Sequence, residues 1–259
     1  MFKLIWVFFR VGAMNELHYR VNFIIELFQA LIALGTGLVG LWLVFSHTTT
    51  LAGWTPPQLL AVMGIYTIMG GLIQGTIQPN MQRLMDEIQQ GTLDYALTKP
   101  ADSQVLVSVR EVRVWQSVDV AVGIIVLLIA VFQLQTVIGI GSALIFVALL
   151  LLGGLMIYSF WLILTTGAFW VVRMENVLEL FQGVYQSGRW PVDVYPGWLR
   201  AGLTFLIPVA FAVTVPADAL TGRLTLFTML EAAALALALL TFARWFWRLG
   251  LRRYSGASA

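Results

Sequence analysis

NMQRLMDEIQQGTLDYALTKP, residues 80–100, is the longest charged and polar run in an otherwise apolar chain. Its apolar residues recur at the spacing of one face of an amphipathic helix: Met81, Leu84, Met85 and Ile88. Its charged and amide residues share the opposite face: Arg83, Asp86, Glu87, Gln89 and Gln90. Asn80 is predicted to cap the first turn, and Gly91 to end the helix in a left-handed conformation. About ten residues are too few to stay helical alone in water, so a membrane interface or a soluble partner is expected to hold this helix; a solvated connector between two spans is the alternative.

The composition around this stretch is that of an integral membrane protein. The chain is 59% hydrophobic and 11% charged, with a mean hydropathy of +0.86, whereas soluble domains carry about 25% charged residues. We therefore predict an all-α integral membrane fold, with residues 1–259 forming a single transmembrane domain. The absence of cysteine excludes disulfides and thiolate metal sites. Arginines and lysines punctuate the apolar runs instead of forming a patch, so no nucleic-acid partner is expected.

Six apolar runs are predicted to span the membrane, at about residues 21–45, 58–78, 114–132, 137–172, 174–190 and 224–247. Residues 1–20 place aromatic side chains near Lys3 and Arg10, which predicts a helix lying along the membrane interface. Gly71 and Gly75 form a G-x-x-x-G pair, which permits close helix contact within the second span.

Caps and breakers set the predicted ends of these helices. Pro79 is expected to end the second span. Asp102 or Ser103 is expected to cap a long helix that begins in water and enters the membrane near Val114. The fourth apolar run is far longer than one span needs, so it is expected to tilt, protrude or break, with the glycine pair at residues 153–154 as its weak point.

Basic residues near both ends predict that both termini are cytoplasmic, which requires an even number of crossings. Counting both 174–190 and 198–217 as spans gives seven. Two solutions remain open. Either 174–190 is the fifth span and residues 197–219 form a re-entrant hairpin on the outer side, or 173–196 is a cytoplasmic helix and 198–217 is the fifth span.

Three segments resemble one family of membrane proteins. The segment EIQQGTLDYALTKPADSQVLVS, residues 87–108, is similar to the cytoplasmic loop of type-2 ATP-binding-cassette (ABC) exporter permeases, in the branch whose loop reads close to GTLD-x-x-L-x-KP. The tail WRLGLRRYSGASA, residues 247–259, and SGRWPVDVYPGWLRAGLTFLIPVAFAVTVPADALTG, residues 187–222, also resemble that branch.

The resemblance implies a permease subunit with six spans, both termini in the cytoplasm, in the inner (cytoplasmic) membrane. It implies a dimer, as a homodimer or as a heterodimer with a related permease, that docks two ATP-hydrolysing subunits. It also favours the first topology, with a re-entrant hairpin broken at Pro208. In such permeases the loop between spans two and three, here residues 80–113, carries a coupling helix that inserts into a groove on the ATPase.

Mapped onto this chain, the coupling helix is Met81–Gln90 with residues 91–94 beside it. The implied contacts with the ATPase subunit are Met81, Arg83, Leu84, Met85, Asp86, Glu87, Ile88, Gly91, Thr92, Leu93 and Asp94. The chain itself is expected to bind no cofactor, and ATP and magnesium are expected on the partner ATPase.

No motif for nucleotide hydrolysis occurs in the sequence. There is no G-x-x-x-x-G-K-[ST] phosphate cradle and no Gly-Lys pair. The chain is therefore expected not to be an enzyme, and an ATPase would have to be a separate polypeptide. A secondary transporter working without an ATPase is the alternative, although we find no internal repeat of the kind such transporters show.

A few polar residues lie inside predicted spans. Asp119, Glu231 and Glu26 are intramembrane acids, which either serve a function or reach an interface or a neighbouring arginine. Gln182 and Gln186 are expected either to line a pathway or to form a hydrogen bond between helices. No catalytic set and no metal-ligand spacing appears. The many Phe, Trp and Met residues suit an amphipathic or lipid-like substrate, and they suit contact with lipid equally.

Overall fold

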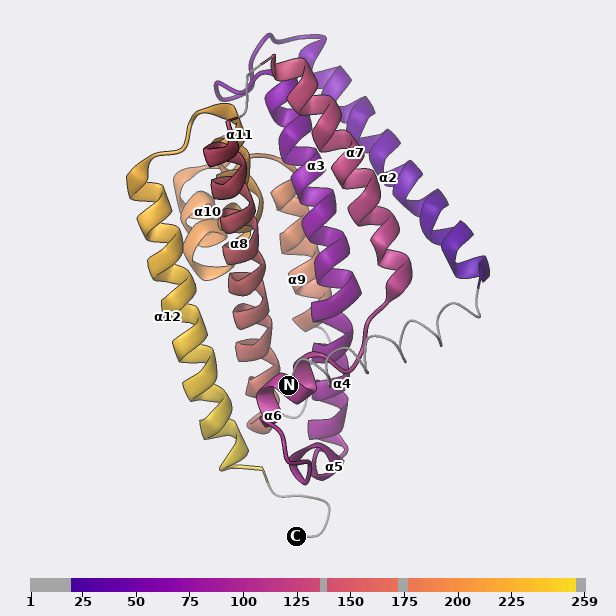
Figure 1. Ribbon diagram of the computed structural model, residues 1–259, viewed down its shortest axis with the longest axis vertical. Coiled ribbons are helices and arrows are strands. Elements are labelled where there is room, and N and C mark those ends of the chain that lie inside the picture. Colours follow the sequence, from indigo (N-terminus) through magenta and orange to yellow (C-terminus); the bar gives the residue numbers. More distant parts are fainter. Residues whose placement is uncertain (1–19, 136–138, 172–176, 255–259) are drawn as a thin grey trace.

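The computed structural model describes residues 20–135, 139–171 and 177–254, and the regular structure in these ranges is helical. The predicted interfacial helix at residues 1–20 falls almost entirely outside them. Five described helices are long and apolar enough to cross a membrane, or six if one bent pair counts as a span. This confirms the predicted all-α membrane fold. The long helices lie side by side along the long axis of the molecule (Figure 1).

The helices follow one another with these bounds: α2 Arg20–Phe45, α3 Pro56–Leu72, the π-helix η1 Ile73–Ile77, α4 Gln78–Gln89, α5 Asp94–Leu97, α6 Ser103–Ser108, η2 Val114–Gln116, α7 Ser117–Leu134, α8 Ile140–Thr166, η3 Gly167–Phe169, α9 Val177–Gln186, η4 Ser187–Arg189, η5 Val192–Val194, α10 Gly197–Ala201, the π-helices η6 Gly202–Leu206 and η7 Ala210–Thr214, α11 Val215–Thr221 and α12 Leu226–Leu251. We call the end of the bundle that holds α5 the α5 end, and the opposite end, which holds the α2–α3 loop, the distal end (Figure 1).

The second span does not end at Pro79, as the sequence suggested. α3, η1 and α4 form one helix of 34 residues, Pro56–Gln89. In a regular helix the nitrogen of residue 79 would donate to the Gly75 carbonyl, but proline has no N–H. The π-helix shifts the hydrogen-bond register just before this point, and the Gly75 carbonyl accepts from the Arg113 N–H at 2.8 Å instead. The helix passes through Pro79 because a distant segment satisfies the freed carbonyl.

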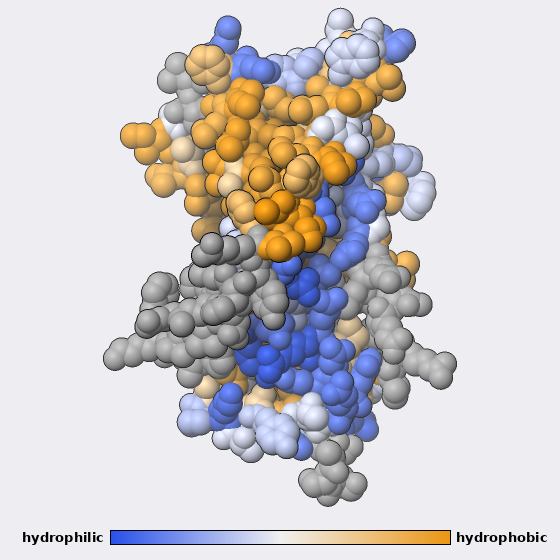
Figure 2. All heavy atoms as spheres, turned by 90° about the vertical axis from the view of Figure 1, so that its right-hand side faces the viewer, coloured by the Kyte–Doolittle hydropathy of each residue, from blue (hydrophilic) through white to orange (hydrophobic). Residues whose placement is uncertain are grey.

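This helix is about 51 Å long at 1.5 Å per residue. The hydrocarbon core of a bilayer is about 30 Å thick, so about 20 Å of the helix must project beyond it. The apolar side chains exposed on α2 belong to the part of the molecule that can face lipid: Val21, Ile32, Val39, Trp42 and Leu43. On the face seen from the right of Figure 1, hydrophobic side chains cover the distal half and hydrophilic ones dominate below (Figure 2).

Glycines bring α3 and α7 into close contact. A Cβ on Gly64 would lie 2.8 Å from the Leu127 nitrogen, and one on Gly71 would lie 2.8 Å from Val120 Cγ2. Gly123 of α7 meets Ile68 in the same way, at 2.7 Å. Gly71 was singled out from the sequence, and Gly64 and Gly123 extend the small-residue contact toward the distal end.

Of the three outcomes expected for the long fourth run, a tilt, a protrusion or a break, the break is not found, because α8 is continuous through Gly153 and Gly154. Gly153 has a different use. A Cβ there would lie 2.6 Å from Ala212 Cα and 2.7 Å from the Phe211 carbonyl, so the missing side chain lets η7 lie directly against α8. At its C-terminal end the run continues into the short 3₁₀-helix η3.

The helix predicted from Asp102 into the membrane is also shorter than expected. Asp102 does cap it, since its Oδ1 accepts from the Val105 N–H at 3.2 Å. However, α6 ends at Ser108, and the third span restarts with η2 and α7. The intervening residues are held by side chains of α4 instead of by helical hydrogen bonds, as described below.

Residues 197–221 fold into a bent pair of helices. The segments Gly197–Leu206 and Ala210–Thr221 meet at 77° around Pro208. Both ends of the pair lie beside Trp54, a fully buried side chain in the α2–α3 loop. Just before the pair, Asp193 Oδ2 accepts from Trp54 Nε1 at 3.1 Å; just after it, the Arg223 guanidinium lies 4.3 Å from the centre of the Trp54 ring. The segment therefore starts and ends at the distal end, as a re-entrant hairpin does.

The fifth predicted span, 174–190, is described only from Val177 onward. α9 has 10 residues, about 15 Å of helix, and is not among the helices long enough to cross by themselves. It nevertheless carries the chain toward the distal end, because η3 lies beside α12 near the α5 end and Asp193 lies at Trp54 (Figure 1).

Candidate functional site

The predicted amphipathic helix lies at the α5 end, but its apolar stripe faces inward. Met81, Leu84, Met85 and Ile88 are between 0% and 8% exposed, and Leu93 is fully buried. They join one core with Leu106, Trp161 and Trp247, and α4 packs on α6, α8 and η3. The chain itself therefore supplies the surface that holds the helix, and contact of these apolar side chains with an ATPase subunit stays a prediction. Gly91 ends the helix with φ of 69°, as predicted.

Asn80 does not cap the helix either, since it lies inside the continuous helix and is 1% exposed. Its Nδ2 donates to the Glu111 carbonyl at 2.7 Å, and its Oδ1 accepts from the Glu111 N–H at 2.9 Å. The same amide donates to the Thr76 carbonyl at 2.6 Å. One buried side chain thus fixes the loop after α6 against the projecting helix.

Ion pairs strengthen this attachment. Arg110 donates to both carboxylate oxygens of Glu87, at 2.9 and 2.7 Å, and its side chain is only 7% exposed. Arg83 bridges Glu87 and Glu111 at 3.0 Å each. Bidentate, partly buried arginine–carboxylate pairs hold a fixed geometry. The residues that carry Arg110 and Glu111, directly after α6, therefore move with α4 as one unit. Glu87, one of the predicted interface residues, therefore forms ion pairs within the loop of residues 80–113.

A second polar cluster ties the same loop to α8 and α12. Arg244 donates to both carboxylate oxygens of Asp102 and, at 2.8 Å, to Gln104 Oε1. Gln104 Nε2 donates to the Tyr158 hydroxyl at 3.3 Å, and Ser108 lies 2.8 Å from the same hydroxyl. The hydrogen bonds from Arg244 lower the pKa of the Asp102 carboxyl below its ordinary value near 3.8. We call these five residues the loop clamp.

Between residues 80 and 97, the side chains that remain exposed are polar, with one aromatic exception. Arg83, Asp86, Gln89 and Gln90 are exposed on α4, while Gly91, Thr92 and Asp94 are half-buried. Tyr95 of α5 is 79% exposed. An aromatic ring that stands in water at the tip of a well-fixed loop is typical of an anchor for a protein partner.

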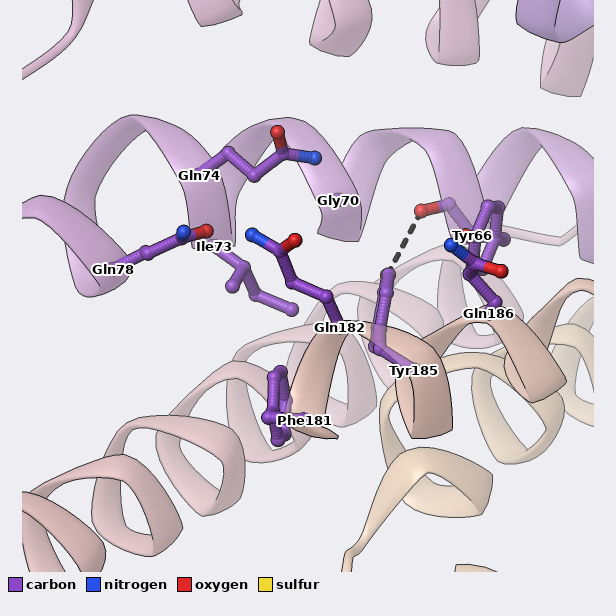
Figure 3. Close-up of a pocket in the computed structure, with 9 residues that line it drawn as sticks. All are labelled: Tyr66, Gly70, Ile73, Gln74, Gln78, Phe181, Gln182, Tyr185 and Gln186. Carbon is purple, nitrogen blue, oxygen red and sulfur yellow. Dashed lines mark hydrogen bonds between the residues drawn. The ribbon is translucent and has the colours of Figure 1, made fainter. Parts of the chain in front are cut away.

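Four glutamines line a groove between α9 and the long helix Pro56–Gln89, which we call the projecting helix (Figure 3). Gln74 and Gln78 come from η1 and α4, and Gln182 and Gln186 from α9; together with Tyr66 and Tyr185 they line a pocket of about 130 Å³. The Gln182 side chain extends from α9 toward η1 (Figure 3).

The groove is built on a tyrosine pair. The rings of Tyr66 and Tyr185 stack with centroids 4.9 Å apart, and the Tyr185 hydroxyl donates to the Tyr66 carbonyl at 2.9 Å. Gln182 and Gln186 are exposed, and neither side chain forms a hydrogen bond with another described residue. The amides therefore stay available as donors and acceptors, and the predicted structural hydrogen bond between helices is not found in the described part of the chain.

The intramembrane acids lie in different places. Glu26 accepts from Gln116 Nε2 at 2.8 Å. Asp119 lies in the first turn of α7 and pairs with no arginine or lysine of the described residues, so of the alternatives for this acid the pairing with a neighbouring arginine is not found. Glu231 lines a separate polar pocket between the bent helix pair of residues 197–221 and α12, with Asp218 and Arg200. Within the described ranges, no cluster of His, Asp and Glu could hold a metal ion.

Several residues of these sites were missed from the sequence. Gln74 and Gln78 are four residues apart, as are Gln182 and Gln186, and this shared spacing could have identified both walls of the groove. The partners within the loop clamp could not be found in this way, because Asp102 and Arg244 are 142 residues apart.

The comparisons with known proteins agree with the fold. A family model described as "ABC-2 family transporter protein" matches residues 31–258. No curated protein and no solved structure matches the chain.

Proposed function

The chain belongs to the ABC-2 family of transporter proteins, and we propose that it is the permease of an ATP-driven exporter whose α5 end docks a separate ATPase subunit. Family membership makes the chain the membrane component of an ABC transporter. The proposal adds where the ATPase binds, how its movement reaches the spans and what is moved.

The construction of the α5 end is the observation that carries the docking proposal. A loop used to transmit force must be rigid and must be attached to the spans. Asn80 and Glu87 of α4 fix the residues that follow α6, through Glu111 and Arg110. The loop clamp fixes α6 and its N-terminal cap to α8 and α12. A push on α5 would therefore be felt by three long helices at once. Tyr95 and the exposed polar face of α4 provide the surface for contact.

The glutamine groove supports a place for the transport pathway. Its amides converge on one groove between two helices, and those of Gln182 and Gln186 form no hydrogen bond with another described residue, so they can bind water or a substrate. The π-helix supplies Gln74 to this wall, and π-helical turns within α-helices occur frequently at functional sites. We place the pathway along the face shared by η1 and α9.

Orientation and assembly follow from the same proposal. The α5 end would face the cytoplasm, which places the C-terminus there too, and the distal end would face outward across the cell's inner membrane. Two ATPase subunits that bind ATP and magnesium, and a second permease, identical or related, would complete the transporter. The transported molecule would be amphipathic or lipid-like.

Site-specific photo-cross-linking tests the docking surface. The full chain, carrying a photoreactive phenylalanine analogue at position 95, is purified from its native membranes after irradiation. Trp198, 78% exposed at the distal end, gives a matched control position. We expect a cross-link from position 95 to a polypeptide with ATPase activity and none from position 198. Cross-linking of the ATPase from position 198 alone, or from neither position while it still co-purifies, would contradict docking at α5.

A further inference from the structure

A cation without a carboxylate partner lies inside the distal half of the molecule. Arg189 ends η4, and no Asp or Glu within the described ranges pairs with it. Its guanidinium lies 5.8 Å from the centre of the Tyr66 ring. The other distal arginines are engaged: Arg200 pairs with Asp193 at 2.8 Å, and Arg223 donates to Gln58 Oε1 at 3.1 Å.

This arginine opens onto a slot between α2 and α3. The slot has a volume of about 90 Å³. Its lining is otherwise almost wholly apolar: Gly37, Gly40, Leu41, Leu59, Met63 and Trp190, with Thr36 beside them. The Thr36 hydroxyl already donates to the Ala33 carbonyl at 2.9 Å. The slot thus offers one fixed positive charge and an apolar wall.

The depth of the slot suits an amphiphile. Leu59 and Met63 lie three and seven residues into α3, which is about 5 to 10 Å from its distal end. Gly37 lies eight residues before the end of α2, about 12 Å from it. With the distal ends of α2 and α3 at the membrane boundary, these positions lie about 5 to 12 Å inside the hydrocarbon. An arginine is costly there unless an anion or water meets it.

Glycine keeps the slot open on the α2 side. A Cβ on Gly40 would meet nothing within 4 Å, although Gly40 lines the slot. One on Gly37 would lie 2.9 Å from Met63 Sδ, so Gly37 sets the contact between the helices and Gly40 leaves the space. In the described part of the chain, a side chain at position 40 would clash with no neighbour, so the space beside Gly40 is not required for helix packing.

We propose that this slot binds an amphiphile with a phosphate headgroup, with the headgroup on Arg189 and the hydrocarbon chain beside Gly40. The planar guanidinium matches phosphate oxygens through paired N–H donors. Tyr66 contacts Arg189 and also lines the glutamine groove, so the slot adjoins the proposed pathway. That the bound amphiphile is the transported molecule rests on the proposed function; the binding itself does not.

Binding of two lipids with and without a phosphate headgroup tests the proposal. The full chain in a neutral maltoside detergent is titrated with oleoyl lysophosphatidate and with monooleoylglycerol, each carrying the same fluorophore on its chain. We expect saturable binding of the phosphatidate, about tenfold or more tighter than of the uncharged lipid, because the second lipid has no phosphate oxygens to accept hydrogen bonds from Arg189. Equal affinities, or binding of both without saturation, would overturn the proposal.

Variants separate the headgroup contact from the chain contact. Arg189→Gln should remove the preference for phosphate, and Arg189→Lys should restore part of it. Gly40→Leu should fill the slot and weaken both lipids about equally. The controls are Arg200→Gln, a distal cation outside the slot, and Gly35→Leu, on the same helix with nothing within 4 Å; neither should change binding. If Arg189→Gln keeps the preference, or Gly40→Leu changes the oligomeric state instead of lipid binding, the slot is not a phosphate-lipid site.

The assay needs no ATPase, so its failure is distinguishable from a failure of the proposed function. If the chain binds no lysophosphatidate but supports ATP-driven export, the lipid site is refuted and the proposed function stands. If binding is saturable and depends on Arg189 but no ATPase partner exists, the lipid site stands and the proposed function is refuted.

Discussion

Asn80 shows how one side chain can hold a loop that sequence patterns place only approximately. Asparagine is a common helix cap, but here the buried Asn80 amide binds the backbone of Glu111: its Nδ2 donates to the Glu111 carbonyl and its Oδ1 accepts from the Glu111 N–H. A cap needs a helix that begins at that point. Here the helix begins at Pro56 and continues past Asn80, because the Arg113 N–H satisfies the carbonyl that Pro79 leaves free.

Replacing Asn80 by Leu should destabilise the chain markedly. The substitution leaves the Glu111 N–H and carbonyl without partners in a buried place, at a cost of about 1–3 kcal/mol for each group. Thermal unfolding in detergent, followed by loss of monodisperse protein, should show a lower midpoint than for the native chain. Gln89→Leu, on the exposed face of the same helix, should leave the midpoint nearly unchanged. Equal midpoints for the two variants would mean that Asn80 does not hold the loop.

The pair Asp102–Arg244 predicts an acid-sensitive attachment of the loop. The pKa of Asp102 is lower in the folded chain than its ordinary value near 3.8. The stabilisation is therefore complete above about pH 5 and is lost as the pH falls through about 4 toward the folded-state pKa. Both side chains are partly exposed, so the expected contribution is at most about 1 kcal/mol.

Unfolding midpoints between about pH 6 and pH 3 check this prediction. The native chain should lose stability over that window more steeply than Arg244→Gln, in which the carboxyl has no cation to lower its pKa. Arg248→Gln, which changes an exposed arginine one turn further along α12, should keep the native slope. Parallel curves for the native chain and Arg244→Gln would contradict the pairing.

Among the elements, α8 and the bent helix pair of residues 197–221 pack through a glycine that has no side chain. Gly153→Ala would place a methyl group 2.6 Å from Ala212 Cα, and both atoms belong to packed helices, so backbone must shift. We expect a loss of about 1–3 kcal/mol. Gly154→Ala meets only the flexible end of Met69 at 3.7 Å and should be neutral or slightly stabilising, since alanine favours helix. Matched thermal unfolding of the two variants decides; equal effects would contradict the close approach.

The elements also show what a sequence of this kind can predict. α2, α7 and α12 were predicted within four residues of their ends, because long apolar runs leave little freedom in a bilayer, whereas α8 ends six residues before the predicted end of its span. Pro79, Asn80 and the residue pair 153–154 were misread, since each signal depends on a neighbour that lies far away in the sequence. The stripe from Met81 to Ile88 was read correctly as an apolar face. Sequence periodicity gives a face but not the surface that covers it, and here the chain's own α6, α8 and η3 cover it.

For the whole molecule, the two ends of the bundle define a topology that can be labelled directly. The chain has no cysteine, so single cysteines report cleanly. Thr50→Cys and Val194→Cys both lie at the distal end and should react with a membrane-impermeant maleimide added outside the cell. Gln90→Cys, at the α5 end, should react only after the membrane is opened. Labelling of Val194→Cys from the cytoplasmic side would contradict the re-entrant hairpin, and outside labelling of Gln90→Cys would reverse the molecule.

We propose that the ATPase contacts the exposed tip of a loop that is fixed to three helices. Truncation of a buried aromatic anchor costs about 2 kcal/mol or more at protein interfaces, roughly thirtyfold in affinity. Tyr95→Ala leaves the core untouched, because its side chain is exposed. Trp198→Ala removes an equally exposed ring from the distal end and serves as the control.

The measurement is the rate of ATP hydrolysis by the ATPase subunit that co-purifies with the chain, reconstituted at limiting concentration in lipid nanodiscs with each variant. We predict that the native chain and Trp198→Ala stimulate hydrolysis equally, and that Tyr95→Ala loses most of the stimulation while remaining folded. Full stimulation by Tyr95→Ala would contradict the claim that the α5 end couples this permease to its ATPase.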